Sequence, residues 1–130
     1  MLGITAVYAG LCGLMLVGLS AGVIRQRGRA RVSVGDGGDA GLIRWIRAQG
    51  NFAEYVPLAL LLLALAEAQG APAVALHGLG GALVLGRVLH AWGMVSGRDL
   101  HPARGAGMVL TFAVLVLGGA GLLAHGLAGG

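Results

Sequence analysis

Long apolar runs alternate with short polar segments along the chain. Residues 1–24 contain no charged side chain. At about 1.5 Å per residue, a helix of that length spans the hydrocarbon core of a bilayer, which is roughly 30 Å thick. The same pattern recurs three times and predicts transmembrane helices over about 2–24, 40–69, 72–96 and 105–126. We therefore expect an all-α membrane protein, a four-transmembrane-helix bundle that forms a single domain over residues 1–130.

Local signals place the ends of these helices. Asp39 is suited to cap the second helix, and Pro57 is expected to kink it by freeing the carbonyl of Ala53. Gly70 and Pro72 leave room only for a tight turn between the second and third helices. These two helices are therefore expected to form an antiparallel hairpin.

Charge is informative through its placement. The chain has 57% hydrophobic residues, five acidic residues and nine arginines. Four of the arginines follow the first apolar run, whereas a cleaved secretory signal would carry its positive charge in front, so this run is expected to remain as an anchor. The termini and residues 67–72 contain no arginine. This positive-inside pattern predicts that both termini lie outside and that the two other loops face the cytoplasm, in a bacterial inner membrane.

A polar stripe interrupts the second helix. Arg47, Asn51 and Glu54 stand at i, i+4 and i+7, so they share one helix face. Ionisable groups at membrane depth are costly, so this face must meet protein or ligand. The hairpin places it beside the stripe formed by Arg87 and His90 on the third helix.

Cations outnumber carboxylates in this cluster. We expect Glu54 to pair with Arg87, which would leave Arg47 and a loop arginine for the carboxylates of a ligand. The alternative is a satisfied polar network that joins the helices without a ligand. His77 lies far from the cluster and is interpreted as structural or lipid-facing.

Other chemistries find little support in the sequence. There is no Cys-x-x-Cys motif, no phosphate-loop signature and no histidine pair at metal spacing on one helix face, so no metal is expected. Cys12 is the single cysteine, which rules out an intrachain disulfide. The arginines of residues 25–31 fit the topological signal better than a nucleic-acid patch, and no nucleic-acid partner is expected.

The polar stripe also carries a family resemblance. Residues 47–57 (RAQGNFAEYVP) resemble the RxxxNxxE/D-Y-x-P signature of the MAPEG family, the membrane-associated proteins in eicosanoid and glutathione metabolism. Residues 87–90 (RVLH) and 31–33 (RVS) resemble other segments of the same family. The resemblance implies a homotrimer of four-helix subunits that binds glutathione near the cytoplasmic face, between neighbouring subunits.

The resemblance also implies roles for individual residues. An arginine just before the fourth helix activates the glutathione thiol; Arg104 is our choice, and Arg98 stays open. Met94 departs from the family because catalytic relatives commonly have a tyrosine there. The glutathione-binding residues implied by the motifs are Arg27, Arg47, Gln49, Asn51, Glu54, Tyr55, Arg87 and His90.

The chemistry of the cluster agrees with such a ligand. Glutathione carries two carboxylates, one ammonium and one thiol, which suit several arginines and one glutamate. The implied activity is that of a glutathione transferase or peroxidase, with the thiolate attacking a hydrophobic small molecule. A non-catalytic glutathione- or lipid-binding protein of the same family is the alternative, suggested by Met94. A four-helix drug exporter is disfavoured because the first helix lacks the glutamate of that class.

Overall fold

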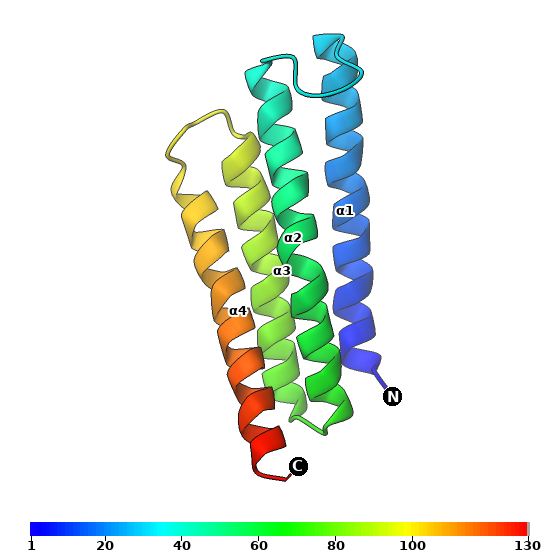
Figure 1. The fold of residues 1–130 in the computed structure, drawn as a ribbon, viewed down its shortest axis with the longest axis vertical. Coiled ribbons are helices and arrows are strands. Elements are labelled where there is room, and N and C mark those ends of the chain that lie inside the picture. The colour runs from blue at the N-terminus through cyan, green and yellow to red at the C-terminus, as the bar shows by residue number, and fades with distance from the viewer. Residues whose placement is uncertain (130) are drawn as a thin grey trace.

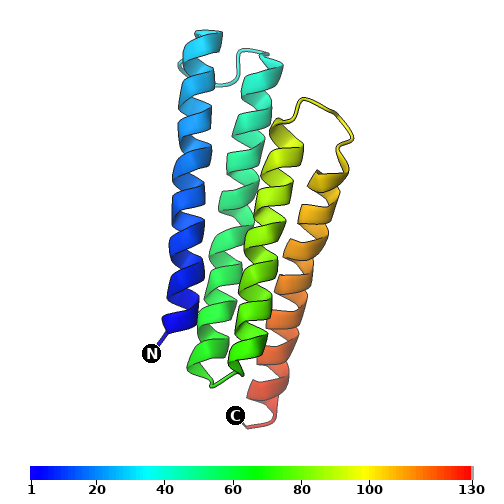
Figure 2. The ribbon, with the colours of Figure 1, turned by 180° about the vertical axis from the view of Figure 1, so that it is seen from behind.

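Four long helices make up the fold, and the computed structural model describes residues 1–129. They run side by side, up and down, and each is long and apolar enough to cross a membrane (Figure 1). Both termini lie at the end of the bundle that holds the α2–α3 turn, and the α1–α2 and α3–α4 loops lie at the opposite end (Figure 2). The helices are α1 (Gly3–Ala30), α2 (Ala40–Ala68), α3 (Ala73–Val95) and α4 (Pro102–Leu127).

Two helices are longer than the hydrophobic pattern predicted. α1 continues beyond residue 24 through three arginines and ends only where Arg31 adopts a left-handed conformation, with φ of 56°. Arginine is a good helix former, and its long side chain can reach water, so the helix outlasts its apolar segment. α4 begins at Pro102 because the imidazole Nδ1 of His101 accepts a hydrogen bond from the N–H of Ala103, 3.2 Å away. Hydropathy alone does not report either boundary.

The start of α2 agrees with the capping signal. The Asp39 carboxylate accepts a hydrogen bond of 2.7 Å from the N–H of Leu42, and the helix begins at Ala40. α2 then runs without interruption through Pro57 to Ala68. Its polar segment and its apolar segment are therefore held on one continuous helix.

α2 and α3 form the centre of the bundle. α1 packs against these two helices from one side and α4 from the other, and α1 and α4 do not touch each other within residues 1–129. The outer faces are apolar, as expected for lipid contact. The buried core consists of Cys12, Leu19, Ala48, Phe52, Val56, Ala59, Leu83 and Val114.

Glycines let α3 and α4 approach closely. A Cβ atom at Gly107 would collide with the carbonyl oxygen of Gly86 and the backbone of His90, and one at Gly93 would collide with the backbone nitrogen of Arg104. Small residues at helix contacts permit such close packing in membranes. The first turn of α4 is consequently held against the end of α3.

A carboxylate from α2 caps the N-terminus of α1 at the other end of the bundle. No side chain of α1 caps its own N-terminus. Instead, Glu67 of α2 accepts hydrogen bonds from the N–H groups of Ile4 (2.9 Å) and Thr5 (2.7 Å). Nearby, the hydroxyl of Tyr8 contacts Nδ1 of His77 at 3.0 Å, which agrees with the structural interpretation of that histidine. A negative group at a helix N-terminus satisfies free N–H groups and meets the positive end of the helix dipole.

Replacing Glu67 by alanine should therefore lower the midpoint of thermal unfolding in detergent. The first turn of α1 would lose its acceptor, and α1 would lose a link to α2. Glu67→Gln should give an intermediate midpoint because the amide keeps one acceptor oxygen without the charge. Unfolding can be followed with a thiol-reactive dye, because the single cysteine, Cys12, is 2% exposed. Gln69→Ala is the control, since Gln69 is exposed on the same turn; equal midpoints for all variants would contradict the capping role.

Candidate functional site

The inner face of α2 meets a buried arginine. Arg87 of α3 is 1% exposed, and its Nη1 donates a hydrogen bond of 2.5 Å to Oδ1 of Asn51. Its Nη2 contacts the sulfur of Met108 on α4 at 3.4 Å, and its Nε has no hydrogen-bond partner within residues 1–129. Arg87 therefore joins α2, α3 and α4 at the depth of the polar stripe. Its guanidinium group has only one strong hydrogen-bond acceptor, Oδ1 of Asn51, within residues 1–129.

The prediction of an ion pair between Glu54 and Arg87 is wrong. Within residues 1–129 the only ion pair joins Arg44 to Asp99, and the side chain of Glu54 is exposed. Three residues turn a helix by about 300°, so Glu54 points about 60° away from Asn51. This difference in direction turns Asn51 toward α3 and leaves Glu54 on the outer surface of the bundle.

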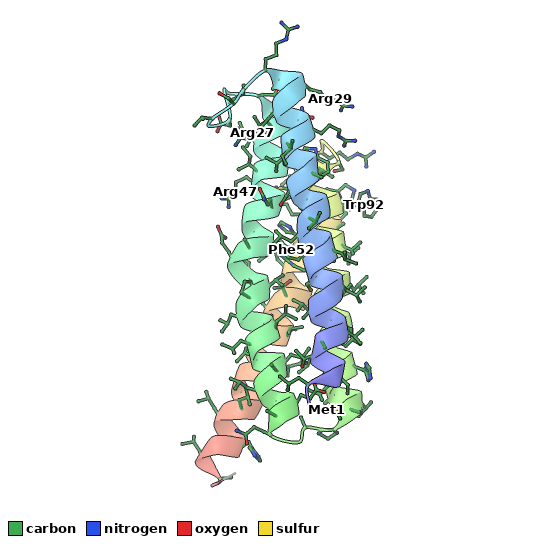
Figure 3. All side chains as sticks on the ribbon, turned by 90° about the vertical axis from the view of Figure 1, so that its right-hand side faces the viewer. Met1, Arg27, Arg29, Arg47, Phe52 and Trp92 are labelled. Carbon is green, nitrogen blue, oxygen red and sulfur yellow. The ribbon has the colours of Figure 1, made fainter. Side chains whose placement is uncertain are left out.

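Two charged groups line the outer face of α2. Arg47 and Glu54 are both exposed, and neither makes a hydrogen bond or an ion pair within residues 1–129. Figure 3 shows Arg47 pointing away from the bundle. Seven residues correspond to about two turns and 10 Å of rise, so the two groups share one face without neutralising each other. Charged groups in this position require a polar partner outside the subunit.

α3 and α4 place the remaining motif residues beside this helix. His90 is buried against α4 at Gly107, and the ring of Tyr55 packs edge-on against Phe112 of α4, with 5.6 Å between the ring centroids. Arg104 is half-buried in the first turn of α4. Met94 packs against the hydrophobic core. The partly buried Met94 therefore contributes to packing at this end of α3.

α1 supplies polar contacts at the same end of the bundle. Nε2 of Gln49 donates a hydrogen bond of 2.8 Å to the hydroxyl of Ser20, which joins α2 to α1. Arg27 donates from Nη1 to the carbonyl oxygen of Gly35, 2.6 Å away, and so holds the α1–α2 loop. The role of Ser20 was not predicted. Its position as a lone polar residue late in an apolar helix is the signal that could have identified it.

The α3–α4 loop is tethered to α2. Nη2 of Arg44 lies 2.6 Å from the carboxylate of Asp99, and its Nη1 lies 3.4 Å from the carbonyl oxygen of Arg98. The imidazole of His101 stacks edge-on with Trp92 at 4.9 Å. The pair of Arg44 and Asp99 was not predicted, because these residues are 55 positions apart. Arg98 itself is exposed in this loop, unlike Arg104.

The implied binding residues thus differ in exposure. Arg87 and His90 are buried inside the bundle, and Arg47 and Glu54 are exposed on its surface. The half-buried residues are Arg27, Gln49, Asn51 and Tyr55. Two cavities with mainly apolar walls lie elsewhere. One of about 360 Å³ is lined by α2, the α2–α3 turn, α3 and α4, and one of about 380 Å³ lies between α3 and α4. Within residues 1–129, no group of three acidic, histidine or cysteine side chains is placed to hold a metal ion. A polar ligand at Arg47 and Glu54 would need a second surface to enclose it.

Comparison with known proteins identifies the family of the chain. The model of the MAPEG family matches residues 5–124. The chain is 38% identical over 114 residues to inner membrane protein YecN of Escherichia coli K12. The aligned region covers 88% of this chain and 86% of that protein. The same protein of Escherichia coli O6:H1 strain CFT073 matches equally well. These matches span all four helices.

Proposed function

Because the chain belongs to the MAPEG family, we propose that it is a glutathione transferase or peroxidase of a bacterial inner membrane. It binds glutathione between the subunits of a homotrimer and activates the thiol for attack on a hydrophobic electrophile. One observation carries the proposal: Arg47 and Glu54 stand exposed and unpaired on the outer face of a membrane helix. A neighbouring subunit and a zwitterionic ligand supply the partners that these charges require.

The assembly follows from the same face. Lipid cannot solvate Arg47 and Glu54, so the outer face of α2 packs against another copy of the chain. Both termini lie at the end opposite to the arginine-rich loops. The positive-inside rule then places both termini outside and opens the site to the cytoplasm, where glutathione is available.

Each group of the ligand has a matching group in the site. Arg47 binds a glutathione carboxylate through its guanidinium fork, and Glu54 binds the ammonium. Asn51 and Tyr55 add polar contacts beside them, while Arg87 positions Asn51 from inside the subunit. Gln49 and Arg27, both half-buried, add further contacts, while His90, buried against α4, acts from inside the subunit as Arg87 does.

Arg104 is assigned the activation of the thiol. Its backbone is held against Gly93 in the first turn of α4 and the residue is half-buried, whereas Arg98 is exposed in the loop. An ordinary thiol has a pKa of about 8.5, and a nearby cation favours the thiolate. The thiol proton passes to water, and the thiolate sulfur forms a bond to an electrophilic carbon while the leaving group departs with its electron pair. In the peroxidase variant, the thiolate attacks a peroxide oxygen, the O–O bond breaks, and the alkoxide leaves with its electron pair and takes a proton from water. A second glutathione thiol then displaces water from the resulting sulfenic acid and gives glutathione disulfide and an alcohol as products.

A second function is favoured by Met94. Its side chain packs into the core and offers no hydroxyl to the ligand. In this alternative the protein binds glutathione or a lipid without turnover. Binding of glutathione without formation of a thiolate would support it.

Glutathione binding to the purified protein, measured by calorimetry with thiolate absorbance in parallel, tests the proposal. We expect binding together with a thiolate signal near neutral pH. Arg104→Ala should reduce that signal by about tenfold or more, because loss of a nearby cation shifts a pKa by one unit or more. Binding itself should weaken less than the signal, since Arg47 and Glu54 remain.

The matched variant is Arg98→Ala, which removes one arginine from the adjoining loop. Arg98→Ala should keep the thiolate signal. If Arg98→Ala lost the signal and Arg104→Ala kept it, the activation of the thiol would be assigned to Arg98. Absence of any glutathione binding by the wild-type protein would overturn the proposed function.

A further inference from the structure

A groove between α1 and α2 opens on the side of the bundle opposite to Arg47. Its volume is about 200 Å³. Within a helix, two residues turn by about 200°, so Arg25 and Trp45 point away from the face of Arg27 and Arg47. Figure 3 shows Arg29 on the opposite side from Arg27 and Arg47. The groove is lined by Gly18, Ala21, Gly22, Arg25 and Trp45.

Small residues and one aromatic ring shape this groove. The six-membered ring of Trp45 lies directly on Gly22, where a Cβ atom would collide with it. One turn earlier, the space above Gly18 is open, with no heavy atom within 4 Å of the position of a Cβ atom. Ala21 adds its methyl group to this part of the lining. The lower part of the groove therefore offers an apolar channel to a lipid chain.

The upper part of the groove carries donors without acceptors. The guanidinium carbon of Arg25 lies 5.9 Å from the centroid of the Trp45 ring, and no carboxylate pairs with it within residues 1–129. Arg29 follows one turn later on the same face and is also exposed and unpaired. The indole N–H of Trp45 makes no hydrogen bond to the described part of the chain, and it lies on the part of the indole remote from Gly22. Two cations and one N–H donor thus surround the mouth of an apolar groove.

We propose that this groove binds an anionic phospholipid of the surrounding bilayer. The phosphate is held by Arg25, Arg29 and the indole N–H of Trp45, and one acyl chain lies along the groove past Gly22 and Gly18. Charge complementarity selects this occupant, since a cationic mouth above an apolar floor matches an anionic headgroup above a hydrocarbon chain. Tryptophan and arginine also suit the depth of lipid headgroups. The site is separate from the glutathione face and does not depend on the proposed function.

The test uses Trp45 as a reporter in reconstituted bilayers. Trp92→Phe leaves Trp45 as the single tryptophan, because the chain contains two. Phosphatidylglycerol brominated near the headgroup end of its acyl chains should quench Trp45 fluorescence at lower mole fraction than brominated phosphatidylcholine. The expected preference is about fivefold, the contribution of one arginine near a lipid surface.

Substitutions at two positions separate the headgroup from the chain. Arg25→Gln should reduce the preference toward equal quenching by the two lipids, while Arg25→Lys should retain most of it. Gly18→Leu should weaken quenching by both lipids, because the added side chain occupies the groove; its Cβ atom meets no heavy atom within 4 Å, and leucine favours the helix. Arg31→Gln is the matched control: it removes one exposed arginine outside the groove and should leave the preference intact.

Three results would overturn the proposal. Equal quenching by both lipids in the protein with its arginines intact would exclude headgroup selection. Loss of the preference in Arg31→Gln to the same degree as in Arg25→Gln would attribute it to net charge instead of the groove. Absence of quenching by either lipid would show that another protein surface, such as a second copy, covers Trp45.

Discussion

Replacing Gly107 by alanine should destabilise the protein by about 3 kcal/mol or more. The added methyl group would meet the carbonyl oxygen of Gly86 and the backbone nitrogen of His90. Backbone atoms of a hydrogen-bonded helix cannot turn aside as a flexible side chain can, so α4 must move away from α3. That movement would also displace Arg104, which lies one turn earlier on α4.

Gly105→Ala provides the matched comparison on the same helix. Gly105 is exposed, and a Cβ atom there meets nothing within 4 Å. Alanine is the better helix former by roughly 1 kcal/mol, so this variant should be neutral or slightly more stable. The dye reaction of Cys12 during heating in detergent measures both variants. Equal midpoints for the two would mean that the contact between α3 and α4 is not closely packed.

Replacing Asn51 by leucine should cost about 2 to 3 kcal/mol, although leucine is the more apolar residue. Asn51 is the one oxygen acceptor of the buried Arg87 guanidinium within residues 1–129. Its removal leaves a buried charged donor with only the Met108 sulfur, a weak acceptor. The same unfolding assay in detergent reports the loss.

The double variant Asn51→Leu with Arg87→Met separates the loss of this bond from loss of packing. With both polar partners replaced by apolar side chains of similar size, no buried donor remains unsatisfied, and most of the stability should return. A double-mutant cycle that also includes Arg87→Met alone gives the coupling energy between the two positions. Additive effects of the two single substitutions would contradict a functional bond between Asn51 and Arg87.

Much of the fold could be predicted from the sequence. Each helix is long and apolar along its own length, and that property is visible without a partner. The cap at Asp39 is likewise local, since it joins residues three positions apart. The ends of α1 and α4 were placed less well. Arginine-bearing turns extend α1, and His101 starts α4 before the apolar run begins.

The sequence placed Asn51 and Arg87 in one polar cluster and the structure joins them, but the predicted pairing of Glu54 with Arg87 is wrong, and the ligand-binding roles stay predictions. Helical periodicity groups Arg47, Asn51 and Glu54 on one side of α2, and it does not say which of them meets α3. A difference of about 60° around the helix decides that Asn51 contacts Arg87 and that Glu54 does not. The contact of Glu67 with the first turn of α1 joins distant parts of the chain, so no local sequence pattern predicts it.

The sequence alone determined that this is a membrane protein with four helices, and it determined which polar residues gather at one end. Those properties follow from composition and from spacing along the chain, because hydrocarbon selects continuous apolar helices. Only the tertiary structure decided how the helices rotate against one another: α2 turns Ala48, Phe52 and Val56 into the core, and glycine contacts bring α3 close to α4. The rotation buries Arg87 and turns Arg47 and Glu54 outward. It therefore settles which charges the subunit satisfies within itself and which it presents to its surroundings.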